Sequence, residues 1–196
     1  KFGNFRWAGE KTVEVYYNWD GGACVFGGND FSGPESPLPM SVLTETLRSS
    51  VAEINENLNG ALTLEFKGPA TRAQLCDSSA EPDIVVGVGT LEAAGQALSY
   101  GHLRAGTFAV YTAARVFVSN TAPFTCRDAP VYRDLRHTLT HELLHAVGIG
   151  HSEEPGVLMA PTFSVCRSGY AMQDDDVAAL AALYPPKQPV IAVTPV

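Results

Sequence analysis

The stretch HELLHAVGIGH, residues 141–151, constrains this chain more than any other feature, because it holds three of the five histidines. Residues four apart in an α-helix lie one turn above one another, so His141 and His145 can direct both imidazoles at one ion. Gly148 follows where the helix would have to end, and glycine tolerates the left-handed conformation that reverses the chain. His151 could then reach the same ion. The segment predicts a helix, a sharp turn and three metal ligands.

Three protein ligands and one open position are typical of a catalytic zinc site. Glu142 lies about 100° around the helix from the first ligand, from where its carboxylate could reach a water in the open position. Zinc activates such a water, and a neighbouring carboxylate can take its proton during attack on a carbonyl. Glu142 is therefore predicted to act as base and then acid. His137 shares the helical face, but Thr138 follows it and no third ligand fits that register, so we interpret it as an ordinary helix histidine.

Composition narrows the class of protein and its partners. The chain has 196 residues, 45% hydrophobic and 17% charged, which suits one well-buried core or one core divided by a cleft. A net charge of −8 without a Lys/Arg cluster argues against nucleic acid as a partner. No apolar run approaches the ~20 residues of a membrane helix. The chain starts at Lys1 rather than methionine, so we expect a processed or trimmed form.

The four cysteines are widely spaced and include no CxxC pair. This pattern favours two disulfides and an oxidising, extracellular compartment over buried free thiols. Of the three pairings that four cysteines allow, we prefer Cys24–Cys76 and Cys126–Cys166.

Hydrophobic periodicity predicts an α+β chain in the order strand, helix, several strands and two helices, which suggests a mixed sheet with helical backing. Strands are expected at 11–18, 62–66, 83–88 and 107–119, the last as two strands or as one with a bulge. Helices are expected at 40–58, 131–148 and 173–184. Loops are expected at His102 and in the segment 18–37, which is rich in Gly, Pro, Asn and Asp.

The motif HExxHxxGxxH followed by GVLMAP, with Met159 eight residues after His151, resembles the metzincin zinc peptidases. The short connection is similar to that of the matrixin branch, the relatives of the matrix metalloproteinases. RWAGEKTVEVYYN, DIVVGV and MQDDDVAALAALYP resemble the family's first strand, third strand and closing helix.

The resemblance implies a metzincin-like zincin catalytic domain over residues 1–185, built on a twisted mixed sheet. Residues 1–151 would supply that sheet, the backing helix and the active-site helix. Residues 152–185 would form a small C-terminal subdomain with the methionine turn and the final helix. The Pro-rich residues 186–196 would be a linker or a tail lying on the surface.

The resemblance also assigns roles to single residues. Met159 would lie beneath the histidines without ligating, although an ordinary core methionine fits the same burial. Pro161 and Phe163 would form one wall of the pocket for the residue after the cleaved bond. Asp175 and Asp176 would tie the last helix to the domain, or else form a solvated helix start. An extended peptide would pair with the strand that contains Gly95, Gln96, Ala97 and Leu98.

By this resemblance the chain would be a secreted, monomeric endopeptidase with one Zn²⁺, kept latent by its own propeptide and preferring an apolar residue after the scissile bond. Its partners would be protein or peptide substrates. No spacing predicts a second histidine site, and a Ca²⁺ site would leave no readable pattern. The alternative is a non-catalytic zinc-binding interaction module derived from a peptidase, which would have no need of Glu142.

Overall fold

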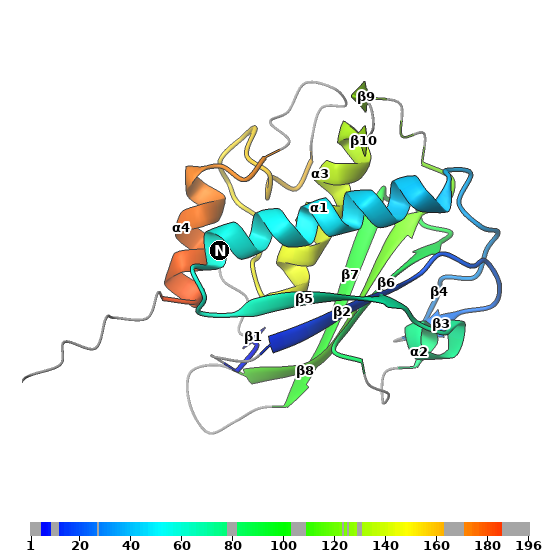
Figure 1. Ribbon diagram of the computed structural model, residues 1–196, viewed down its shortest axis with the longest axis horizontal. Helices are drawn as coiled ribbons and strands as arrows, with labels where there is room; N and C mark the ends of the chain where they lie inside the picture. Colours follow the sequence, from blue (N-terminus) through cyan, green and yellow to red (C-terminus); the bar gives the residue numbers. More distant parts are fainter. Residues whose placement is uncertain are drawn as a thin grey trace, which may run out of the picture.

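A six-stranded sheet lies at the centre of the computed structural model (Figure 1). The structure describes residues 5–8, 12–26, 28–77, 82–102, 109–122, 124, 126–128, 131–162 and 171–185. The strand order is β1-β8-β6-β2-β5, and β7 pairs with β8. The pairs along that order are parallel, and β7 is antiparallel, so the sheet is mixed. The strands are β1 (Phe5–Arg6), β2 (Thr12–Asn18), β5 (Thr63–Pro69), β6 (Ile84–Gly89), β7 (Gly95–His102) and β8 (Ala109–Ser119).

Three longer helices accompany the sheet: α1 (Met40–Leu58), α3 (Arg133–Ala146) and α4 (Asp174–Leu183). Helix α1 packs against α3, and α4 lies beside the C-terminal end of α1 (Figure 1). The apolar stripe that predicts α1 is buried, and the helix ends at Asn59 with φ 50°. The side chain of Asn55 then binds both backbone groups of Leu64, at 2.7 and 2.8 Å, and so joins α1 to β5.

The buried apolar residues form two clusters on the described part of the chain. The larger one includes side chains from the sheet, α1, α3 and α4. The smaller one contains Phe26, Phe31, Leu75, Val85 and Phe117. The rings of Phe31 and Phe117 stack with centroids 3.9 Å apart. The same sheet therefore buries apolar side chains in two places, and the metal-binding helix α3 belongs to the larger cluster.

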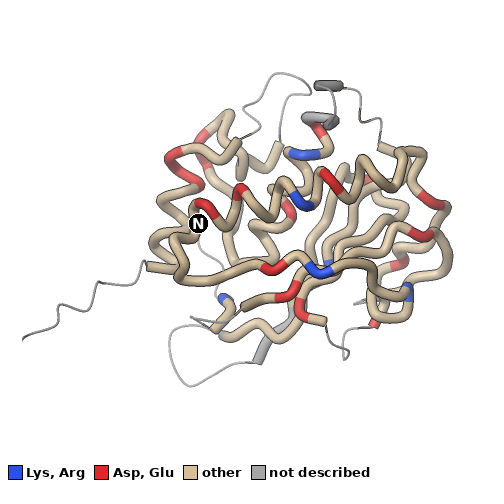
Figure 2. The backbone as a smooth tube through the Cα atoms, viewed as in Figure 1, with Lys and Arg blue, Asp and Glu red and all other residues tan. Residues whose placement is uncertain are grey.

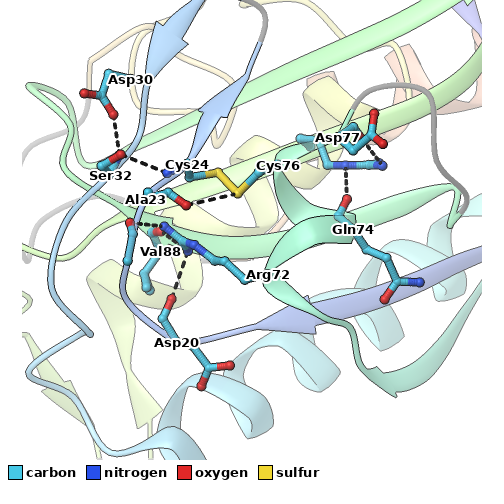
Figure 3. The surroundings of a disulfide bond; sticks show 12 residues. Asp20, Ala23, Cys24, Asp30, Ser32, Arg72, Gln74, Cys76, Asp77 and Val88 are labelled. Atoms are coloured by element: carbon cyan, nitrogen blue, oxygen red, sulfur yellow. Dashed lines mark hydrogen bonds between the residues drawn. A yellow bond between two sulfur atoms is a disulfide. The ribbon is translucent and has the colours of Figure 1, made fainter.

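The segment 18–37, predicted to be a loop, contains the two-residue strands β3 (Val25–Phe26) and β4 (Asn29–Asp30), which pair antiparallel. A disulfide joins Cys24 to Cys76 at the end of helix α2 (Arg72–Cys76) (Figure 3). The Arg72 guanidinium donates hydrogen bonds to the carbonyl oxygens of Asp20, Gly22 and Val88. These bonds and the disulfide connect the described residues of the segment to α2 and β6, and we call these residues the disulfide-bonded lobe.

The remaining differences from the sequence prediction concern short elements. The region 107–119 forms one strand, β8, within the described residues, and its register with β7 shifts between Tyr100 and Gly101. His102 lies at the end of β7, so its assignment to a loop was wrong. Before α3, β9 (Arg127–Asp128) pairs with β10 (Val131–Tyr132), and the helix therefore begins two residues later than predicted.

Acidic side chains outnumber basic ones along the chain and are spread over several elements in Figure 2. Among the residues that the structure describes, no helix has the length and apolar character needed to cross a bilayer.

Candidate metal centre and cleft

Helix α3 carries the first two predicted metal ligands, His141 and His145, on one face. The opposite side of the helix is anchored in the core, where Leu139, Leu143 and Leu144 are fully buried. This amphipathic pattern leaves both imidazoles half-buried at the surface of the helix. Two histidines therefore face one point in space without rearrangement of the backbone.

The chain reverses at Gly148, which has a φ of 104°. Its amide donates to the carbonyl of His145 at 3.0 Å, and the amide of Ile149 donates to that of Leu144 at 2.9 Å. These two bonds end the helix, and a residue with a side chain would be strained at this φ. The turn brings His151 back towards the helix, as its sequence position predicts.

The three imidazoles converge through their Nε2 atoms. His151 Nε2 lies 3.3 Å from His141 Nε2 and 3.1 Å from His145 Nε2. Zn–N distances of about 2.0–2.1 Å in a tetrahedral site separate two nitrogens by about 3.3 Å. Among the His, Cys, Asp and Glu side chains that the structure describes, these three histidines form a group close enough to share one ion. The spacing fits zinc with one position left open.

The other ring nitrogens of two ligands point to backbone carbonyls. His141 Nδ1 lies 2.8 Å from the oxygen of Leu158, and His145 Nδ1 lies 2.7 Å from that of Ile149. If Nδ1 carries the proton, Nε2 keeps its lone pair for a metal. The pKa of both imidazoles is lowered to about 4, chiefly by burial and in part by the neighbouring histidines, while the bond to the backbone carbonyl opposes the shift in each case. The neutral, metal-binding form is therefore favoured at neutral pH.

Glu142 lies beside this centre with 7% of its surface exposed. The backbone amide of Ala97 on β7 hydrogen-bonds its carboxylate. Burial raises the pKa of Glu142 to about 8, and the hydrogen bond from Ala97 acts in the opposite direction. Its side chain passes close to Gly95, where an added Cβ would lie 2.7 Å from Glu142 Cγ. The carboxylate is thus held between α3 and β7, next to the three histidines.

A cavity of about 340 Å³ contains the three histidines and Glu142. One side is β7 and the segment before it, and the other is the segment after the methionine turn. Its remaining lining residues are Ala93, Ala94, Gly95, Gln96, Ala97, His137, Thr138, Ala160 and Pro161. Within the described part of the chain, no strand pairs with the edge of β7 opposite β8. The cleft therefore has a free strand edge along one wall.

The predicted substrate-binding residues separate into three groups. Gly95, Gln96, Ala97 and Pro161 line the cavity. The side chain of Leu98 packs against the smaller apolar cluster instead, because successive side chains of a strand point to opposite faces. Phe163 lies outside the described residues. His137, predicted to be an ordinary helix histidine, is 1% exposed and borders the cavity.

The methionine turn and the last helix, which follow the histidines in the sequence, are hydrogen-bonded to the segment that carries the third histidine and to each other. Met159 is buried in the main core, and its carbonyl accepts a bond from the amide of Ser152, directly after His151. Asp176 is buried and accepts bonds from the amides of Leu158 and Met159 at 3.2 and 3.1 Å. Asp175 is exposed. Asp176 thus ties the last helix to the domain, whereas Asp175 belongs to a solvated helix start.

Of the four cysteines, Cys24 and Cys76 form a disulfide with each other. Cys126 is also disulfide-bonded. Cys166 lies outside the described residues, so the second pairing stays a prediction.

A mixed sheet over an HExxH helix, three converging imidazoles and a glutamate in the cleft define the class of zinc metallopeptidases. A family model described as matrixin (Peptidase M10) matches residues 74–185, more than half of the chain. The chain belongs to the matrixin family.

Curated relatives match a shorter part of the chain. Human matrix metalloproteinase-19 is 45% identical over 58 residues, 30% of this chain and 11% of that protein. Mouse matrix metalloproteinase-19 is 39% identical over 56 residues, 29% of this chain and 11% of that protein. The 72 kDa type IV collagenase of chicken is 41% identical over 44 residues, 22% of this chain and 6% of that protein. The matched stretch thus spans about a tenth or less of each relative.

Proposed function

We propose that residues 1–185 are the catalytic domain of a secreted zinc endopeptidase that hydrolyses internal peptide bonds. The observation that supports this most is the joint placement of three Nε2 atoms at tetrahedral spacing and a buried Glu142 beside them. Residues 1–151 would form one side of the cleft, and residues 152–185 the other. A domain of this kind would act on protein or peptide substrates.

His141, His145 and His151 would hold the zinc ion, which when bound supplies the Lewis acidity that activates water and polarises a carbonyl. Glu142 would accept the proton of the attacking water and deliver it to the leaving amine. The Ala97 amide keeps the carboxylate in position for both transfers.

The substrate would bind as an extended strand along the open edge of β7. Gly95, Gln96, Ala97 and Leu98 would offer backbone groups to it, apart from the Ala97 amide that Glu142 binds, and Pro161 would contact it from the other wall. The small side chains of Ala93, Ala94 and Ala160 support a preference for an apolar residue after the cut bond. Phe163 would complete that wall.

Further properties of the family belong to the same proposal. We expect an extracellular monomer that its own propeptide keeps latent. A Ca²⁺ site built from scattered oxygen ligands would be compatible with this function.

Glu142→Ala tests the proposal, because it removes the base and leaves the three ligands. We expect turnover of denatured protein to fall by about 10²–10⁴-fold, with one zinc ion per chain still bound by elemental analysis. Glu56→Ala, at an exposed position of α1, is the matched control and should keep full activity.

Cleavage-site profiling of a proteome-derived peptide library would test the apolar preference in the same preparation. If the unmutated, zinc-loaded chain cleaved neither denatured protein nor the library, the peptidase assignment would be wrong. A non-catalytic zinc-binding module would then explain the site better.

A further inference from the structure

We propose that Tyr184 and Trp7 are positioning residues for the metal centre. They bind the carbonyl groups of Ala146, the last residue of α3, and of Val147, which follows it, and thereby fix the turn that places His151 beside the other two ligands. The inference rests on the zinc site of the proposed function, and does not require that the chain cleave peptides.

The end of a helix leaves carbonyl oxygens without a partner in the helix. At the end of α3, the carbonyls of Ala146 and of the next residue, Val147, are bound by side chains from distant parts of the chain. The hydroxyl of Tyr184 donates to the carbonyl of Val147 at 2.7 Å. The indole Nε1 of Trp7 donates to the carbonyl of Ala146 at 2.9 Å. Two consecutive carbonyls at the end of the active-site helix are therefore held from outside it.

Trp7 and Tyr184 are also hydrogen-bonded to each other. The backbone amide of Trp7 donates to the Tyr184 hydroxyl at 3.0 Å, so this oxygen is donor and acceptor at once. Arg6 adds a bond from its guanidinium to the carbonyl of Leu183 at 3.2 Å. Trp7 is 0% and Tyr184 3% exposed. Breaking a bond at this depth leaves a polar group without water, which makes the arrangement rigid.

The position of these bonds links them to the zinc ligands. Val147 directly precedes Gly148, the residue whose φ of 104° reverses the chain. The next residue, Ile149, provides the carbonyl that orients the imidazole of His145, and His151 follows two residues later. A rotation of the Val147 carbonyl would therefore change the direction in which the chain leaves the helix. The hydroxyl of Tyr184 opposes that rotation.

Tyr184→Phe tests the proposal in the 196-residue chain, since it removes the hydroxyl and keeps the ring. We expect the dissociation constant for zinc, measured by chelator competition, to rise by about 3- to 10-fold. Direct partners of metal ligands typically account for about 10–100-fold, and Tyr184 acts one step further away. We also expect a changed visible absorption spectrum of the Co²⁺-substituted protein. Trp7→Phe should act in the same direction.

Two controls separate positioning from general loss of stability. Tyr16→Phe removes a tyrosine hydroxyl that binds Glu14 on the sheet, and should leave zinc affinity unchanged. Val13→Ala lowers stability in the core of β2 and should lower the melting temperature without a change in zinc affinity.

Unchanged zinc affinity and an unchanged Co²⁺ spectrum in folded Tyr184→Phe and Trp7→Phe would overturn the proposal. Equal weakening of zinc binding by Val13→Ala would do so as well. Failure of the unmutated chain to bind zinc would instead overturn the proposed function, so the two failures are distinguishable.

Discussion

Glu142 can occupy its place in the cleft because Gly95, on the facing strand, has no side chain. A Cβ at that position would lie 2.7 Å from both Glu142 Cγ and Thr138 Cγ2, and 3.1 Å from a carboxylate oxygen. These distances are shorter than van der Waals contact, so the carboxylate would have to move. The position of the proposed base thus depends on a residue that carries no chemistry of its own.

Gly95→Ala should therefore impair catalysis more than folding. We expect kcat/KM to fall by about 10- to 100-fold, since displacement of a reacting group by about 1 Å can cost that much. Zinc content by elemental analysis should stay at one ion per chain. Thr138→Ser retains the hydroxyl that binds Asp134 and should be nearly neutral alone, and it should partly restore Gly95→Ala. Full activity of Gly95→Ala would contradict the assigned position of Glu142.

At the scale of elements, helix α4 and the methionine turn form one unit through Asp176. Its two carboxylate oxygens accept bonds from the amides of Leu158, Met159 and Gln173. Leu158 in turn provides the carbonyl that lies 2.8 Å from His141 Nδ1. Burial raises the pKa of Asp176, and the backbone bonds oppose this shift. The last helix therefore reaches the metal centre through a single buried carboxylate.

Asp176→Asn should lower the free energy of unfolding by about 2–3 kcal/mol, because an amide group replaces one of the accepting oxygens of a charged hydrogen-bond acceptor. Chemical denaturation of the zinc-loaded chain would measure this change. The exposed neighbour gives a matched control, and Asp175→Asn should change stability by less than about 0.5 kcal/mol. Equal effects of the two substitutions would show that the buried bonds do not matter.

The helices and strands that could be predicted from the sequence are those in which apolar or ligand residues recur at a regular spacing. The apolar stripe of α1, the alternation in β2 and the metal-binding pattern of α3 each follow from nearby residues. The pairs β3–β4 and β9–β10 have two residues in each strand, which is too short for an alternating pattern to be read from the sequence. The burial of His137 beside the cleft could not be predicted either, because it requires the position of β7.

At the scale of the whole molecule, the disulfide-bonded lobe lies at the opposite end of the structure from α4 (Figure 1). Cys24 and Cys76 are 52 residues apart in the sequence, and both adjoin the smaller apolar cluster. The metal centre belongs to the larger one. Stability and metal binding should therefore respond differently when this bridge is removed.

Joint replacement of Cys24 and Cys76 by serine should lower the free energy of unfolding by about 2–4 kcal/mol, because the unfolded chain gains freedom. Zinc affinity of the folded variant should stay within about twofold of the parent, since no ligand or ligand partner is touched. Denaturation and chelator competition on one preparation would check both. A large loss of zinc affinity would show that the lobe and the metal centre are coupled.

The unpaired edge of β7 has a consequence for the molecule in concentrated solution. A strand edge whose amide and carbonyl groups are not paired in a ladder can accept a strand from a second copy, which is the usual start of edge-to-edge aggregation. The irregularity between Tyr100 and Gly101 limits the regular stretch to the part from Gly95 to Tyr100. An inhibitor peptide of that length should both block the cleft and keep the protein dispersed.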